Sequence, residues 1–177
     1  MVDRYETPNS IHYLTFSTFR SMKFFRDNHL CEMFLVALGN TRIKHQFNLI
    51  AYVIMPDHVH LLIQEGENSS VSAMLSALKR GFAYRANRHI ECKYPQWSSR
   101  MQVSVGDRVV QRFWQKGGGY DRAVTNEKLF REMLDYIHLN PVRAGLARTA
   151  ESYLWSSANY WITGRQGSLK VDPPRFR

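Results

Sequence analysis

The chain has 177 residues, 44% of them hydrophobic, and its 24 Lys and Arg outnumber its 15 Asp and Glu for a formal net charge of +9. This length suits one packed domain, the composition argues against intrinsic disorder, and the charge favours polyanionic partners. The sequence contains neither a bilayer-spanning apolar run nor an apolar signal core, so we expect a cytoplasmic protein with no membrane partner. We expect one domain over residues 1–177, with 150–177 as a C-terminal extension.

The first third of the chain predicts a strand, a helix and a hairpin. The stretch "SIHYLTFSTF" alternates with period two, which predicts a strand over residues 11–19. Residues 27–45 carry apolar side chains at helical spacings behind Asp27 or Asn28 as N-cap, which predicts a helix. "FNLIAYVI" and "HVHLLIQ" then predict two strands joined at "MPD", because Pro56 fits a tight turn and cannot sit in a central ladder.

The rest of the chain predicts two longer helices around an irregular segment. Residues 71–89 have an apolar stripe with Arg80 on the opposite face, which predicts an amphipathic helix. Residues 91–121 predict a loop, a short strand at "RVVQRFWQ" and a flexible turn at "KGGGYDR". A helix is predicted from Thr125 to about Asn140, because the residue before Pro141 is pushed out of the α region. The tail "ESYLWSSANYWITG" predicts a short aromatic helix or turn.

Together these elements follow the order strand, helix, strand, strand, helix, strand, with one further helix. That order is the βαββαβ plan of a ferredoxin-like α+β domain, in which helices cover an antiparallel sheet. We expect the added C-terminal helix, which carries Tyr136, to pack against this sheet.

A pair of histidines stands out in the predicted hairpin, in the otherwise apolar run "AYVIMPDHVHLLIQ". Side chains two apart on a strand share a face, so His58 and His60 would lie side by side and could bind one metal ion. The alternative is a pair of partly exposed histidines with no ligand, and the short H-x-H pattern alone does not decide between them. The sequence after His60 lacks the Asp-His of binuclear hydrolases.

Two residues of the predicted C-terminal helix are candidates to complete that site. Tyr136 and Asn140 are four residues apart, so they share a helix face at the edge of the apolar stripe. Two imidazoles and an amide oxygen form an uncharged donor set suited to Mg²⁺ or Mn²⁺ held jointly with substrate phosphates. A phenol beside such an ion is a candidate nucleophile towards phosphorus. The alternatives are a core tyrosine and a helix-ending asparagine.

Three linked motifs, "MPDHVHLLI", "RFWQKGGGYDR" and "YIHLNPVRAGL", followed by "WSSANY", resemble the REP-associated tyrosine transposases. These form part of the single-tyrosine branch of the HUH endonucleases. The resemblance implies a bacterial, nucleoid-associated, ferredoxin-like nuclease in which His58 and His60 bind a divalent metal. It also implies that Tyr136 attacks the DNA backbone, leaving the 5′ end on the tyrosine and a free 3′-OH. Asn140 falls at the position of the family's third, helix-borne metal ligand.

The same resemblance implies a substrate of single-stranded DNA with imperfect palindromic hairpins, recognised partly through a short guide sequence. Basic side chains would contact its phosphates, and for each the alternative is a solvated surface charge. The candidates are Lys79, Arg80, Arg112, Lys116, Arg122 and Arg143. The sequence leaves open whether the protein is a monomer or a homodimer, and whether a second subunit supplies the tyrosine.

Two other interpretations of the sequence remain open. The chain could be a catalytically inactive DNA-binding module derived from the same fold, or an unrelated enzyme with a structural transition-metal site. The second predicts that Tyr136 is buried far from both imidazoles. The nuclease interpretation predicts the Tyr136 hydroxyl in one cleft with His58 and His60, and Asn140 near enough to share their ion.

Overall fold

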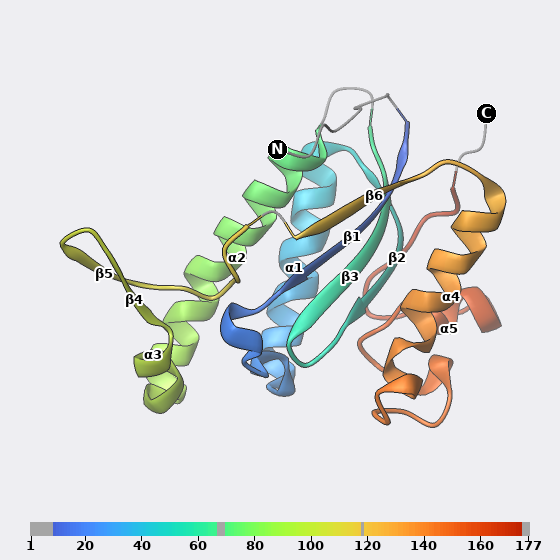
Figure 1. Ribbon diagram of the computed structural model, residues 1–177. Coiled ribbons are helices and arrows are strands. Elements are labelled where there is room, and N and C mark those ends of the chain that lie inside the picture. Colours follow the sequence, from blue (N-terminus) through green and yellow to red (C-terminus); the bar gives the residue numbers. More distant parts are fainter. Residues whose placement is uncertain (1–8, 67–69, 118, 175–177) are drawn as a thin grey trace.

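Four strands form one antiparallel sheet in the order β2-β3-β1-β6 (Figure 1). The computed structural model describes residues 9–66, 70–117 and 119–174. The strands are β1 (Ile11–Ser17), β2 (Asn48–Ile54), β3 (His58–Gln64) and β6 (Tyr120–Val124). The predicted α+β fold, an antiparallel sheet covered by helices, is confirmed.

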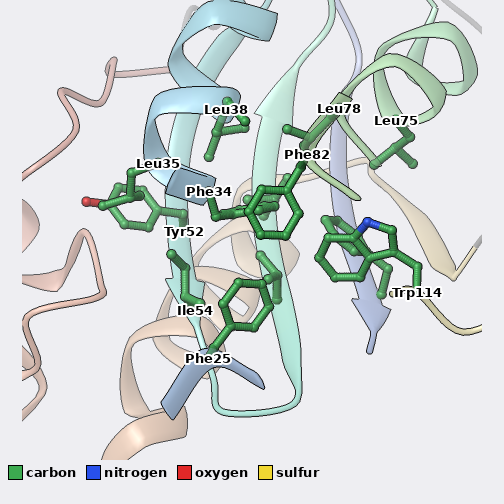
Figure 2. Close-up of a cluster of buried hydrophobic side chains, with 14 of the residues drawn as sticks. Phe25, Phe34, Leu35, Leu38, Tyr52, Ile54, Leu75, Leu78, Phe82 and Trp114 are labelled. Carbon is green, nitrogen blue, oxygen red and sulfur yellow. The ribbon is translucent and has the colours of Figure 1, made fainter. Parts of the chain in front are cut away.

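One face of the sheet packs against α1 (Asn28–His45) and α2 (Val71–Lys93). Asp27 caps α1 by accepting a hydrogen bond from the backbone N–H of His29, and Ser70 caps α2 through Ala73. The core on this face is rich in aromatic side chains, and the rings of Phe34 and Phe82 meet edge to face with centroids 5.2 Å apart (Figure 2). Two short 3-10 turns, η1 (Phe19–Ser21) and η2 (Phe24–Arg26), close the end of this core.

The opposite face packs against α4 (Glu127–Arg143), η3 (Ala150–Ser152) and α5 (Ala158–Thr163) (Figure 1). Ile137 of α4 is fully buried there, and the indole N–H of Trp161 donates to the backbone carbonyl of Ile50 over 2.9 Å. None of the helices in the described ranges is long and apolar enough to cross a membrane.

The fourth strand of the sheet is not the one predicted. "RVVQRFWQ" does not join the sheet: its first residues form β5 (Arg108–Gln111), which pairs with β4 (Gln102–Val105) in a separate two-stranded ribbon after α3 (Pro95–Arg100). Phe113 and Trp114 instead insert into the α1/α2 core. The real edge strand, β6, is largely exposed, so its sequence lacks the apolar alternation that marks a half-buried strand.

The end of α4 also differs from the prediction, because the helix continues through Pro141 to Arg143. A proline within a helix lacks the N–H that would bond to the carbonyl four residues earlier, here that of Ile137, and crowds that carbonyl, but the hydrogen bonds after it can still form. The backbone N–H of Ala144 still donates to the carbonyl of Asn140, and that of Leu146 donates to Pro141. Asn140 therefore lies within the helix, one turn after Tyr136.

Candidate active site

The sheet register decides which side chains of β1 and β3 share the face that packs on α4. Ser17 is opposite His58, Thr15 opposite His60, and Tyr13 opposite Leu62. Since cross-strand partners point to the same side, His58, His60 and Tyr13 all project towards α4. Val59 points the other way and is fully buried in the α1/α2 core, as predicted.

His60 is the buried member of the histidine pair and is held from both sides of its ring. Its Nδ1 lies 2.7 Å from the Tyr13 hydroxyl, and its Nε2 lies 3.1 Å from the amide nitrogen of Asn140. Because the amide N–H donates to Nε2, the ring hydrogen is on Nδ1 and is donated to the Tyr13 oxygen. Burial, and then the neighbouring His58, lower the pKa of His60 to about 3, so its imidazole is neutral at physiological pH.

His58 is oriented by a carboxylate. Its Nδ1 lies 2.6 Å from Oδ1 of Asp57, and since an ionised carboxylate only accepts, Nδ1 carries the hydrogen. The rings of His58 and His60 are nearly perpendicular, with centroids 4.7 Å apart. The hydrogen bonds at both Nδ1 atoms put the ring lone pairs on Nε2, and the Nε2 lone pair of His60 accepts from the Asn140 amide, which would have to turn before a metal ion could bind there.

Tyr136 of α4 lies against the same two strands. Its ring meets that of His60 edge to face, with centroids 5.6 Å apart, and that of Tyr13 at 6.1 Å. The Tyr136 side chain is partly open to solvent, and the Arg143 guanidinium lies 5.6 Å from its ring centroid. One chain thus brings together His58, His60, Tyr136 and Asn140, and Tyr136 is not buried far from the imidazoles.

The donor atoms of this site fit a divalent cation. Two imidazole Nε2 atoms are accompanied by the Asn140 amide, which would present its oxygen instead of its nitrogen after a half-turn of the amide plane. Within the described residues no three His, Cys, Asp or Glu gather as a metal cluster, so a metal ion at the two imidazoles would need Asn140 as its third protein ligand. An uncharged set of this kind suits Mg²⁺ or Mn²⁺ bound together with phosphate oxygens.

The candidate DNA contacts fall into two groups. Arg122 of β6 is opposite Tyr13 in the sheet register, so it shares the face of the imidazoles, as does Arg143 beside Tyr136. The other four line two adjoining cavities of about 540 and 250 Å³ between α2 and residues 111–120, which share Lys79. We call this pair of cavities the basic groove; its cations are Lys79, Arg80, Arg112 and Lys116.

Two residues of the site were not identified from the sequence. Asp57 directly precedes His58, and a carboxylate next to a ligand histidine could have suggested its role. Tyr13 gave no such signal, because its contact with His60 depends on the β1–β3 register.

Comparison with known proteins shows what this chain is similar to. The family model described as "Transposase IS200 like" matches residues 9–138, a range that includes His58, His60 and Tyr136 and ends just before Asn140. A Haemophilus influenzae protein named as a REP-associated tyrosine transposase is 30% identical over 126 residues. That alignment covers 70% of this chain, and this chain spans 66% of the relative's length.

Two solved structures share the fold. A REP-associated tyrosine transposase bound to a REP hairpin superposes with a TM-score of 0.71 at 17% identity, over 100% of this chain and 97% of that one. A Deinococcus radiodurans protein described as a transposase gives a TM-score of 0.50 at 17% identity, over 82% of this chain and 97% of that one.

Proposed function

The chain belongs to the IS200-like transposase family, and on that premise we propose that it cleaves and transfers single-stranded DNA at hairpin-forming palindromes, with Tyr136 as nucleophile. The substrate class is supported by the structural relative that is bound to a REP hairpin and by the formal charge of +9, which attracts a polyphosphate.

The observation that carries this proposal is the meeting of α4 with β3. Tyr136 and Asn140, one turn apart on α4, both face His60: the tyrosine ring centroid is 5.6 Å from that of the imidazole, and the amide nitrogen is 3.1 Å from Nε2. A nucleophile, two imidazoles and an amide in contact on one face of the sheet are the components that phosphodiester transfer through a tyrosine requires.

The chain's own residues have distinct parts in this proposal. Asp57 and Tyr13 hold the two imidazoles through their Nδ1 atoms, so that His58 and His60, through Nε2, would bind a divalent cation together with Asn140. Mg²⁺ or Mn²⁺ bound there would polarise the scissile phosphoryl oxygens. The Arg143 guanidinium, 5.6 Å from the Tyr136 ring centroid, would contact a scissile phosphate held beside the nucleophile.

The proposed transfer is a displacement at phosphorus. The Tyr136 oxygen forms a bond to phosphorus as its proton passes to solvent, the bond from phosphorus to the 3′ oxygen breaks, and that oxygen takes up a proton. The products are a 5′-phosphotyrosine and a free 3′-OH. Because the phosphoester energy is conserved, the reverse reaction with another 3′-OH joins strands.

The test is covalent capture of a labelled DNA strand. A hairpin-bearing strand, labelled on the 3′ side of the cleavage position and incubated with Mn²⁺, should give a labelled protein band that survives denaturation. Tyr136→Phe should give none, whereas Tyr84→Phe, which alters a tyrosine exposed on α2, should behave as wild type. An equal band from wild type and Tyr136→Phe would refute the assignment of the nucleophile.

The alternative function, DNA docking without cleavage, makes a different prediction for the same protein. If the chain only binds hairpins, the His58→Ala/His60→Ala variant loses Mn²⁺ binding while hairpin affinity is retained, and wild type gives no covalent product. The contacts that bring His58, His60, Tyr136 and Asn140 together favour the nuclease.

A further inference from the structure

The β4–β5 ribbon projects from the body of the molecule on the side of α2 (Figure 1). It is fixed at its base, where the Gln111 amide donates to the Ser98 hydroxyl over 2.5 Å and the Arg112 backbone N–H donates to the Met101 carbonyl over 3.0 Å. Neither β4 nor β5 pairs with the main sheet. A two-stranded ribbon on its own is only marginally stable in water, so its exposed position indicates a functional role.

The outer part of the ribbon exposes apolar side chains. Val105, Val109 and Val110 are 52%, 66% and 40% exposed. In the register Val103 is opposite Val110 and Val105 opposite Arg108, so these four share one face, while Val109 points to the other. Apolar side chains gathered on an exposed projection mark a binding surface more often than isolated ones do.

The charge around the ribbon identifies the chemistry of its partner. Residues 95–117 contain the cations Arg100, Arg108, Arg112 and Lys116 and a single acid, Asp107. Within the described part of the chain, none of these four cations forms an ion pair. Arg112 also lines the basic groove with Lys79, whose pKa is lowered by burial, and among the residues that the structure describes no Asp or Glu lines that groove. Anionic phosphates would compensate these charges.

The side chains of the ribbon favour a duplex over an unpaired strand. Proteins that hold unpaired bases stack them on aromatic rings, and residues 102–111 include no aromatic residue. The major groove of a duplex admits a two-stranded β-ribbon, where apolar side chains contact thymine methyl groups and Arg bonds to guanine. Tyr136, an aromatic side chain that is open to solvent, lies beside the imidazoles on the other face of the main sheet.

We propose that the β4–β5 ribbon enters the major groove of a DNA duplex stem, with Arg108 at its tip directed to base edges and Arg80 and Arg112 of the basic groove on the flanking phosphates. This inference rests on the proposed function, because the stem is that of the hairpin substrate. It assigns recognition of paired DNA to the α2 side of the molecule and cleavage of the unpaired strand to the α4 side.

The test measures the affinity of the protein for two labelled DNAs of equal length, a hairpin and an unpaired strand. Binding is measured in EDTA, so that the result does not depend on metal-dependent cleavage. Val105→Glu/Val109→Glu places two anions on the ribbon at exposed positions and should weaken hairpin binding by about tenfold or more. Binding of the unpaired strand should change by less than about twofold, because it does not use this surface. Val36→Glu, at a valine 57% exposed on α1, is the matched control and should bind both DNAs as wild type does.

Three results would overturn the proposal: unchanged hairpin binding by the double variant, an equal loss for both DNAs, or a wild-type dimer in sedimentation that the double variant dissociates. The last would identify the ribbon as an interface between copies of the chain. Failure of the proposed cleavage is seen separately, as absence of the Tyr136-dependent covalent product. A hairpin-selective loss of affinity without that product would support the ribbon and refute the nuclease.

Discussion

The hydroxyl of Tyr13 lies 2.7 Å from Nδ1 of His60, on the side of the ring opposite the Asn140 amide. Burial raises the pKa of Tyr13 well above its ordinary value, so the phenol stays protonated beside the neutral imidazole. The pair fixes both the rotation of the His60 ring and the position of its hydrogen. Tyr13 is therefore a positioning residue for the candidate metal site. It orients His60 as Asp57 orients His58.

Tyr13→Phe should lower the affinity for Mn²⁺ by about 10- to 100-fold, the range found when partners of ligand histidines are removed. The ring that packs beside His60 is retained, so the loss reports the hydrogen bond rather than a cavity. Titration calorimetry of the DNA-free protein measures this affinity. Tyr84→Phe is the control because Tyr84 is 67% exposed on α2. Equal affinities for Tyr13→Phe and wild type would contradict the positioning role.

Asn140 should behave as a ligand and not only as a hydrogen-bond donor to His60. Asn140→Ala should lower Mn²⁺ affinity by about tenfold or more, whereas Asn140→Asp should maintain or increase it, because a carboxylate is a stronger ligand for a hard cation. Asn40→Ala, at an exposed position on α1, should leave the affinity unchanged. A loss of affinity in Asn140→Asp equal to that in Asn140→Ala would show that the amide N–H, not the oxygen, is what the site uses.

The parts of the site that follow from local periodicity could be predicted from the sequence. His58 and His60 share a face because a strand repeats every two residues, and Tyr136 and Asn140 share one because they are a helical turn apart. The contact of Tyr13 with His60 could not be predicted, since a change of one residue in the β1–β3 register would turn Tyr13 to the other face.

The wrong prediction of the fourth strand of the sheet, at "RVVQRFWQ" instead of β6, also has a physical cause. Periodicity reports burial, and β6 is an exposed edge strand, whereas the valine-rich β5 has the composition of a buried strand but lies in the projecting ribbon. Pro141 was predicted to end α4, but a proline in the last helical turn removes a single donor, and the burial of Ile137 and Pro141 offsets that loss.

The metal-free protein should lose stability as the pH falls from about 6.5 towards 4, in part through His138. Burial lowers the pKa of His138 to about 4, and its Nε2 lies 2.9 Å from the Ser157 hydroxyl, which also accepts from the Tyr52 backbone N–H. Between these pH values the unfolded chain binds a proton that the folded protein does not, so unfolding becomes easier. For His138 this amounts to about 2–3 kcal/mol.

Urea unfolding at several pH values measures this dependence. His138→Gln should flatten it between pH 6.5 and 4, leaving the share of His60, whose pKa is lowered in the same direction. Asn40→Ala, which alters a non-titrating side chain at an exposed position in α1, should leave the dependence as in wild type. An unchanged slope in His138→Gln would mean that this histidine is protonated equally in the folded and unfolded states.

Gly119 should be needed for the docking of β6 beside the site. Its backbone has φ +81°, and a Cβ there would lie 2.2 Å from the carbonyl oxygen of Thr15, the residue opposite both Tyr120 and His60. Gly117 also has a positive φ, of +113°, but a Cβ there meets nothing within 4 Å.

Gly117→Ala should therefore cost only backbone strain, about 1–2 kcal/mol, and Gly119→Ala about 1–3 kcal/mol more from the clash. Urea unfolding of both variants gives the difference. Equal losses would mean that β6 shifts away from β1 without cost, and Tyr120 would then not be held beside Tyr13, where their ring centroids are 6.0 Å apart.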